Sequence, residues 1–213
     1  MKRIDVNVDI GEGFPWDADL IRLATSANIC CGEHAGSWEL TLATLHACRD
    51  AGVRIGMHPG FPDRVGMGRN APTAGEAQAW YASVVDQALR FAAEVPDVGY
   101  CKPHGAFYNL IAQGDTHALE AAARIPVPLM LLGDRGQVRE GFAERGYTPD
   151  GTLVPRTEPG AMLEDLSEIA RQAVWLADRV DSICVHGDSD RCVEKLEAVV
   201  RALRDAGYEV AHG

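Results

Sequence analysis

Residues 4–10, with the sequence IDVNVDI, alternate apolar and polar side chains with a period of two, which predicts a β-strand with two different faces. The apolar face, which we expect to pack against helices, carries Ile4, Val6, Val8 and Ile10. Asn7 and Asp9 are two residues apart, so they share the opposite face, which points inward if the strand belongs to a barrel. Buried polar groups cost several kcal/mol unless they are paired, and the candidate partners are Lys102 or a histidine.

Similar short apolar stretches recur along the chain and predict further strands. They cover residues 27–31, 54–59, 98–103, 127–133, 182–187 and 208–212, with a weaker one at 152–155. Apolar positions with a helical period predict helices between them, over residues 37–51, 73–95, 165–180 and 190–206. Ser37 is a suitable N-cap for the first of these helices, and Gly52 and Gly207 suit positions just past helix ends.

Strands that alternate with helices indicate an α/β fold built on a parallel sheet. Polar residues follow nearly every strand, which favours a closed or nearly closed (β/α) TIM-like barrel with seven or eight mostly parallel strands. An open doubly wound sheet is the alternative. The chain has 213 residues and no visible linker or repeat, so we expect one domain over residues 1–213.

The composition is that of a globular protein and argues against some partners. A formal net charge of −11 argues against nucleic acid, because phosphate binding needs a clustered basic surface. No apolar run reaches the roughly 18 residues of a membrane helix, and the N-terminus lacks the apolar core of a signal peptide. We therefore expect a cytoplasmic protein that binds no membrane. The six cysteines form no C-x-x-C pair, which predicts buried free thiols.

Polar side chains at the C-terminal ends of the strands are the site candidates, because β/α barrels place their active sites there. Four of the seven histidines directly follow predicted strands, together with carboxylates and a lysine. Such a convergence of titratable groups is typical of a catalytic site. The candidates are Asn7, Asp9, Glu12, Asn28, His34, His58, Lys102, His104, Tyr108, Asn109, Arg156, His186 and Asp188.

Lys102 precedes Pro103, which holds its backbone extended and directs the ammonium toward the barrel mouth. A lysine there binds a carboxylate, polarises a carbonyl or, when desolvated, acts as a base; a purely structural Asp–Lys pair is the other interpretation.

The loops at residues 32–37, 60–70 and 103–109 are rich in Gly and Pro and can offer backbone N–H groups to an anion. The sequence contains no P-loop, no G-x-S-x-G and no H-E-x-x-H motif.

Six motifs occur along the chain in this order: DVNVDIGEG, TSANICCGEHAG, GVRIGMHPGFPDRVGMGRN, KPHGAFYN, DGTLVPRTEPGAM and ICVHGDS. Together they resemble the LamB/YcsF family, whose members are also called the A subunit of 5-oxoprolinase, over nearly the whole chain. The resemblance implies an irregular (β/α) barrel of the deacetylase-like superfamily. It also implies ATP-dependent cleavage of 5-oxoproline (pyroglutamate) to glutamate with partner subunits B and C. The partners would bind the ATP, because this chain has no P-loop.

The polar positions that match the family's motifs are Asp9, Glu12, His34, His58, Lys102, His104, Arg156, His186 and Asp188. We predict catalytic roles for Asp9, Glu12, His34, His58, Lys102, His104 and Asp188. Substrate-binding roles are predicted for Asn7, Asn28, Tyr108, Asn109, Arg156 and His186. Lactam hydrolysis needs an activated carbonyl, a positioned water and a proton for the ring nitrogen. Asp9 or a histidine is the candidate base, Lys102 would stabilise an oxyanion or a phosphorylated intermediate, and Arg156 would bind the substrate carboxylate.

The chain departs from the family pattern in several places. It is shorter than the family's usual single domain of about 250 residues, with a short segment after IGEG and a missing segment before Asp181. Glu33 stands where the family usually has Phe, and Ser37 where it usually has Asp. Glu33 is expected to add a carboxylate near the site, which would favour a metal or a changed substrate.

Two other classes of function are compatible with the sequence. One is a metal-dependent amide hydrolase or deacetylase, with a divalent metal held by Asp9, His34 and His58. The other is a non-catalytic binding protein on the same barrel, because a fold does not determine a function. The sequence sets no oligomeric state, and a homo-oligomer is compatible with it.

Overall fold

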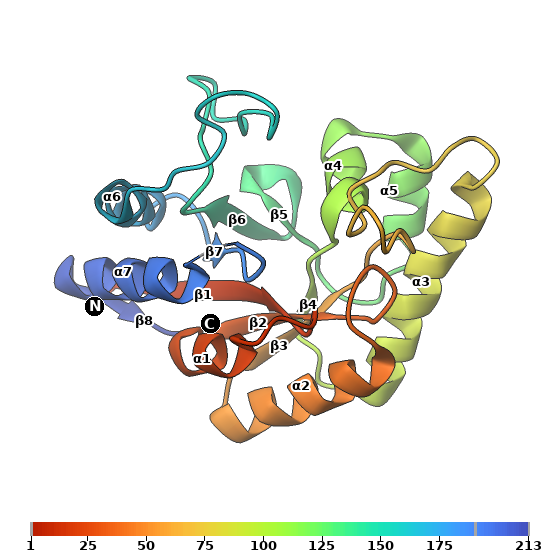
Figure 1. The fold of residues 1–213 in the computed structure, drawn as a ribbon, viewed down its shortest axis with the longest axis horizontal. Helices are drawn as coiled ribbons and strands as arrows, with labels where there is room; N and C mark the ends of the chain where they lie inside the picture. The colour runs from red at the N-terminus through yellow and green to blue at the C-terminus, as the bar shows by residue number, and fades with distance from the viewer. Residues whose placement is uncertain (1, 190, 213) are drawn as a thin grey trace.

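The computed structural model describes residues 2–189 and 191–212, and in them eight parallel strands form one sheet (Figure 1). The strands are β1 (Lys2–Ile10), β2 (Ser26–Cys30), β3 (Arg54–His58), β4 (Tyr100–Cys101), β5 (Met130–Leu132), β6 (Val138–Phe142), β7 (Ser182–Val185) and β8 (Tyr208–Val210). Residues 1, 190 and 213 lie outside this description, and with them the predicted first residue of the last helix, Asp190.

The sheet curls into a nearly closed barrel. The strand order is β4-β3-β2-β1-β7-β6-β5, and β8 pairs with the first residues of β1, off this path. The two ends of the sheet meet at Cys101 and Leu129, which form an isolated parallel bridge. The Cys101 amide donates to the Pro128 carbonyl at 2.9 Å. The predicted (β/α) barrel with seven or eight mostly parallel strands is confirmed.

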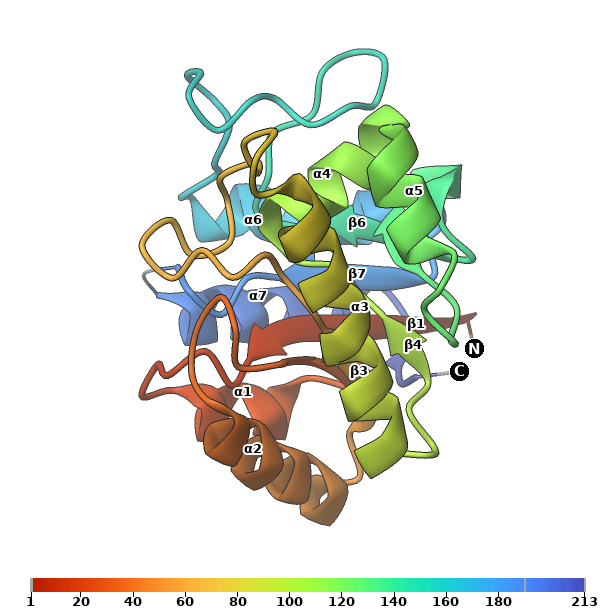
Figure 2. The same cartoon turned by 90° about the vertical axis from the view of Figure 1, so that its right-hand side faces the viewer.

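Helices cover the outside of this barrel, and α3 packs on the sheet in front of β3 (Figure 2). The α-helices of the described residues are α1 (Asp17–Leu23), α2 (Trp38–Ala51), α3 (Ala77–Glu94), α4 (Gly105–Gln113), α5 (Thr116–Ala122), α6 (Leu166–Leu176) and α7 (Cys192–Asp205). At the start of α2, the Ser37 hydroxyl accepts from the Leu40 amide at 3.2 Å. Gly52, with a φ of 69°, ends the same helix, and Gly207 follows α7 with a φ of 87°. These caps confirm the three predicted helix-boundary residues.

The strand β6 was not predicted, and the weak strand predicted at residues 152–155 is wrong. Among the described residues of that stretch, only Leu153 forms a bridge, an isolated antiparallel one with Tyr147. The strand that completes the sheet is Val138–Phe142, which follows β5 after a short 3-10 turn, Gly133–Arg135. Two neighbouring parallel strands are usually joined by a crossover of about a dozen residues or more, often a helix. We expected strands to alternate with helices in this way, so the sequence did not indicate a second strand so soon after β5.

The strand β1 has the two faces that its sequence predicts. Its apolar side chains are buried in the hydrophobic core that includes residues of α1, α2 and α7, and they are Ile4, Val6, Val8 and Ile10. Asn7 and Asp9 are also buried, and they meet polar side chains from other strands.

All six cysteines are free and buried, as expected. No helix within the described residues is long and apolar enough to cross a membrane.

Candidate active site

A cavity of about 610 Å³ gathers the residues that follow the C-terminal ends of the strands. Ten of the thirteen predicted site residues line it: Asp9, Glu12, His58, Lys102, His104, Tyr108, Asn109, Arg156, His186 and Asp188. The other three, Asn7, Asn28 and His34, are fully buried. Each contacts a lining residue: Asn7 faces Lys102, Asn28 donates to Asp9, and His34 faces Glu12. The structure therefore brings all thirteen side chains into one region.

A group that we call the lysine cluster, made of Lys102, Asp9, Glu140 and Cys184, joins four strand ends. The Lys102 ammonium lies 2.8 Å from Asp9 Oδ1, 3.0 Å from Glu140 Oε1 and 3.0 Å from Cys184 Sγ. Burial alone would lower the pKa of Lys102, but Asp9, Cys184 and Glu140 together outweigh it and hold that pKa well above its usual range. This direction favours a charged Lys102, which suits it to stabilise negative charge rather than to act as a base.

The pKa values of the two carboxylates in the lysine cluster shift in opposite directions. Burial would raise the pKa of Asp9, yet the Lys102 ammonium and the nearby His58 hold that pKa well below its usual range. Burial raises the pKa of Glu140, whose second oxygen accepts from the Tyr108 hydroxyl at 3.0 Å. The two carboxylates that share the ammonium thus shift in opposite directions, with the pKa of Asp9 lowered and that of Glu140 raised.

A layer of amide hydrogen bonds inside the barrel supports the lysine cluster. Asn28 donates from Nδ2 to Asp9 Oδ1 and to Asn7 Oδ1, both at 2.7 Å. The Tyr100 hydroxyl donates to Asn28 Oδ1 at 2.7 Å, and Asn7 donates to the Ser182 hydroxyl at 2.8 Å. These bonds offset the cost of burying the polar face of β1.

A second group, the histidine cluster, consists of Glu12, His34, His58 and His104. Glu12 Oε1 lies 3.1 Å from His34 Nε2, 3.6 Å from His104 Nδ1 and 3.9 Å from His58 Nε2. Burial raises the pKa of Glu12 to about 7 and lowers the pKa of both His34 and His104 to about 4. These four buried side chains could hold a metal ion. Asp9, which the sequence placed with His34 and His58, is 3.8 Å from His58 Nε2 and pairs with Lys102 instead.

The glycines of the loop after β3 let the chain approach the histidine cluster closely. A Cβ on Gly68 would lie 2.9 Å from His104 Cδ2 and 2.9 Å from His34 Cβ. Gly68 has a φ of 65°, and the preceding Met67 has a φ of 52°, which is uncommon for a residue with a side chain. The loop is therefore held in a strained conformation against the two imidazole rings.

We expect the substitution Gly68→Ala to lower the free energy of unfolding by about 2–5 kcal/mol in urea titrations. A left-handed residue with a Cβ costs roughly 1–2 kcal/mol, and overpacking adds roughly 1–3 kcal/mol. Gly114→Ala is the matched control, because Gly114 has a φ of 82° and a Cβ added there would meet nothing within 4 Å. Equal destabilisation of the two variants would contradict the importance of the contact with the rings.

A third group links Glu144, His186, Arg156 and Lys195 at the other side of the cavity. Glu144 Oε1 accepts from the His186 amide at 2.9 Å and lies 2.7 Å from His186 Nδ1. Since a carboxylate accepts, the proton sits on Nδ1, and the lone pair of Nε2 faces Arg156 Nη2 at 3.2 Å. Burial would raise the pKa of Glu144, but its hydrogen bonds to His186 outweigh this and lower it. His186 is thus held in one tautomer by an ionised carboxylate.

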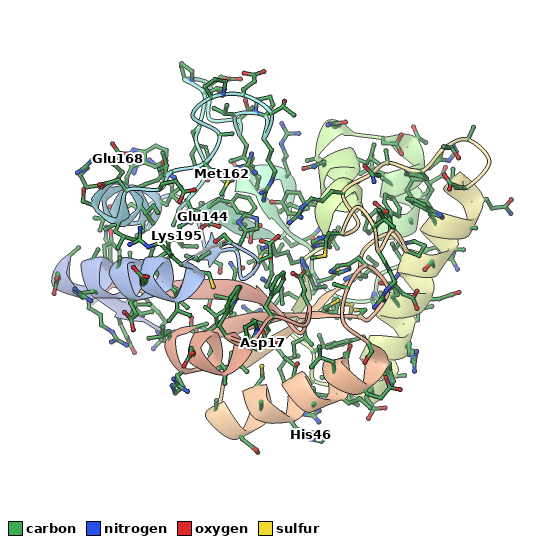
Figure 3. The ribbon with its side chains drawn as sticks, in the orientation of Figure 1. Asp17, His46, Glu144, Met162, Glu168 and Lys195 are labelled. Atoms are coloured by element: carbon green, nitrogen blue, oxygen red, sulfur yellow. The ribbon has the colours of Figure 1, made fainter. Side chains whose placement is uncertain are left out.

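Lys195 supports Glu144 from behind. Its ammonium lies 3.5 Å from Glu144 Oε2, and the side chain is almost wholly buried although it belongs to α7. Figure 3 shows Glu144 and Lys195 next to each other, above α7. The same ammonium lies 3.3 Å from Glu164 Oε2, so this buried lysine joins Glu144, which contacts His186, to a second carboxylate.

Arginines lie along the cavity wall. Arg69 pairs with Asp188, and this contact lowers the pKa of the Asp188 carboxyl against the effect of its burial. Arg145 and Arg156 also line the cavity, and Arg156 contacts His186. Asn109 is exposed at the same wall. The guanidinium of Arg145 is buried and donates to the carbonyls of Ala161 and Val154, so the exposed Arg156 is the arginine best placed to bind an anionic ligand.

Several site residues were missed from the sequence, and they are Glu140, Glu144, Arg145, Cys184 and Lys195. The first three belong to β6 or directly follow it, so missing the strand meant missing them. Cys184 lies in a strand that the sequence predicts. Its thiol belongs to the site only because the Lys102 ammonium, from another strand of the barrel, lies 3.0 Å from its sulfur. Glu33 is exposed and does not line the cavity, so the expected extra carboxylate near the site is wrong.

A family model and related proteins match almost the whole chain. The model of the LamB/YcsF family matches residues 4–213. The 5-oxoprolinase A subunit of Pyrococcus furiosus is 34% identical over 247 aligned positions, covering 98% of this chain and 96% of its own. The alignment is longer than this chain of 213 residues, in line with the missing segments.

Solved structures share the barrel. A lactam utilization protein from Thermus thermophilus superposes with a TM-score of 0.84 at 30% identity, covering 99% of this chain and 100% of its own. A deacetylase named T48 superposes with a TM-score of 0.54 at 19% identity, covering 99% of this chain and 88% of its own. The second likeness concerns the fold alone, and it agrees with the expected deacetylase-like barrel.

Proposed function

Because this chain belongs to the LamB/YcsF family, we propose that it acts as the A subunit of a 5-oxoprolinase, which opens the lactam of 5-oxoproline to give glutamate. The observation that carries the proposal is the pairing of Lys102 with Asp9 at a cavity whose wall carries arginines. A buried ammonium can polarise a lactam carbonyl, and a guanidinium can bind the ring carboxylate. A cavity of about 610 Å³ is large enough for a small lactam.

Lys102 supplies the positive charge at the carbonyl oxygen. In lactam hydrolysis, water adds to the carbonyl carbon, the C–N bond breaks, and the ring nitrogen takes a proton. Negative charge develops on the carbonyl oxygen or, in an ATP-dependent reaction, on a phosphorylated form of it. The Lys102 ammonium, fixed by Asp9, would stabilise that charge without needing to reorganise.

His186 is the best placed base for the attacking water. Its Nε2 lone pair faces the cavity, and Glu144 holds the proton on Nδ1. Asp9 is less suited, because the Lys102 ammonium holds its pKa well below the usual range. Arg156, which contacts Nε2, would turn to the substrate carboxylate and leave the lone pair for water.

ATP and partner subunits belong to the same proposal. This chain has no P-loop, so ATP would bind to subunits B and C, which would deliver the activated lactam. Such a soluble metabolic enzyme would act in the cytoplasm. A metal-dependent amide hydrolase without ATP is the second candidate, and the histidine cluster is the observation that favours it.

Reconstitution tests the proposed function. The purified chain, mixed with partner subunits B and C, 5-oxoproline and ATP, is expected to release glutamate and ADP in step, and neither the chain alone nor the partners alone should do so. Release of glutamate by the chain alone, without ATP, would favour the second candidate. No glutamate under either condition would overturn the lactam assignment.

A further inference from the structure

His58 is held in one tautomer by the backbone. Its Nδ1 lies 2.6 Å from the carbonyl oxygen of Lys102, which can only accept a hydrogen bond. The ring proton of neutral His58 therefore sits on Nδ1. The other nitrogen, Nε2, carries a lone pair and points into the histidine cluster.

His104 is held in the same way by a different carbonyl. Its Nε2 lies 2.6 Å from the Met67 oxygen, so the ring proton sits on Nε2 and Nδ1 carries a lone pair. The carbonyl that fixes this ring belongs to the left-handed residue Met67, with a φ of 52°. Strained backbone of this kind persists where the surrounding structure requires it, here at a side chain of the cluster.

The two lone pairs face each other. His58 Nε2 and His104 Nδ1 are 2.9 Å apart, and neither neutral ring has a proton to place between them. A proton on Glu12 cannot bridge them, because Glu12 Oε1 is 3.9 Å from the first nitrogen and 3.6 Å from the second. An added proton would make a buried imidazolium, which burial disfavours. A cation that accepts several ligands would satisfy both lone pairs.

We propose that Glu12, His34, His58 and His104 bind one divalent transition-metal ion. All four ligand atoms lie within 4.8 Å of one another, and two pairs have the spacing of neighbouring ligands: His58 Nε2 with His104 Nδ1 at 2.9 Å, and Glu12 Oε1 with His34 Nε2 at 3.1 Å. The rings of His34 and His104 stack in parallel with their centroids 3.8 Å apart, so His34 would turn out of this stack to direct its nitrogen at the same ion. Three imidazoles and one carboxylate suit Zn²⁺, Fe²⁺, Co²⁺ or Ni²⁺ better than Mg²⁺ or Ca²⁺, which prefer oxygen ligands. When bound, such an ion would activate a water or polarise a carbonyl at the cavity.

The carbonyls of Lys102 and Met67 fit this interpretation. Ligating histidines usually donate their other ring N–H to a carbonyl or carboxylate, which fixes the ring for the ion. The second group of possible ligands, Asp9, Cys184 and His186, lacks this fit, because the Lys102 ammonium already contacts the first two. The inference rests on the ring nitrogens and does not require the substrate to be a lactam.

Metal uptake by the full chain tests the inference. Protein stripped with dipicolinate is given Zn²⁺ or Co²⁺, passed through a desalting column and analysed for bound metal by mass spectrometry. We expect about one ion per chain, visible d–d bands with Co²⁺, and a higher melting temperature of the stripped protein when Zn²⁺ is added. The variants Glu12→Gln and His104→Gln should lose the bound ion and the Zn²⁺-dependent shift.

The matched control is His46→Gln, because His46 lies on the outer face of α2, away from the cluster (Figure 3). It should bind the ion like the natural chain. Circular dichroism checks that the Glu12→Gln variant is folded, since this change keeps the size of the side chain. The proposal is overturned if the stripped natural chain takes up no ion, or if folded Glu12→Gln and His104→Gln retain it. Uptake without glutamate release would contradict the proposed function only, and glutamate release without uptake would contradict the metal only.

Discussion

The substitution Lys102→Met is expected to lower the turnover of the reconstituted enzyme by about 10²–10³-fold. The ammonium is the positive charge nearest to the carbonyl in our proposal, and removing one such group from an oxyanion site typically costs this much. Turnover is measured as glutamate release at saturating 5-oxoproline and ATP. A variant with at least half of the natural turnover would contradict the assigned role of Lys102.

Stability must be separated from catalysis in this variant. Removing the ammonium leaves the buried carboxylate of Asp9 unpaired, and such a loss costs roughly 3–5 kcal/mol. The double variant Lys102→Met, Asp9→Asn has no buried charge left in this pair, so it should regain much of the stability in urea titrations but none of the turnover. Lys2→Met, at an exposed surface pair, is the control for the change of residue type. Turnover that returns together with stability would show that Lys102 has a structural role only.

The second large effect is expected at His186 and Glu144. His186→Asn should lower turnover by about 10²–10⁴-fold, the usual contribution of a general base. Glu144→Gln should lower it by roughly 10–100-fold, because the amide nitrogen can face Nδ1 and force the ring proton onto Nε2. Long-range ¹H–¹⁵N spectra of the histidine rings report this tautomer directly, which a merely structural role of Glu144 would leave unchanged.

Glu168→Gln is the matched control for this pair. Glu168 is exposed on α6 (Figure 3), so the same chemical change there should affect neither turnover nor the tautomer of His186. If Glu144→Gln keeps both the turnover and the Nδ1 proton, Glu144 does not position the ring. If His186→Asn remains fully active, another group removes the proton from water.

The barrel could be predicted because short apolar strands alternate with helical patterns along the chain, and because polar residues follow nearly every strand. The face of β1 with Asn7 and Asp9 already implied an inward polar layer, and the histidines after other strands implied one shared rim. Three helices, α1, α4 and α5, were missed because seven to nine residues are too few turns to establish a period. The expectation that Glu33 lies near the site was wrong because the direction of a side chain cannot be read from its position in the sequence alone.

The limits of the sequence are clearest at β6. Val138–Phe142 contains Arg139 and Glu140 and follows β5 without a long helix, so neither hydrophobicity nor alternation marks it as a strand. Glu140 is fully buried only because Lys102 and Tyr108 meet it from other elements. Contacts between residues far apart in the chain decide its role, and these become visible only in the folded barrel.

The position of β1 in the sheet has a consequence for synthesis on the ribosome. β1 is made first, but residues 5–8 of it pair with β7 along one edge and residues 2–4 pair with β8, and both of these partners are made last. Until residues 182–210 have been translated, one edge of a strand with a continuous apolar face has no hydrogen-bond partner, and exposed edges of this kind favour association with other chains. The Asn7–Ser182 bond, between residues 175 positions apart, cannot form before then either. The nascent chain should therefore depend on chaperones until its last strands emerge.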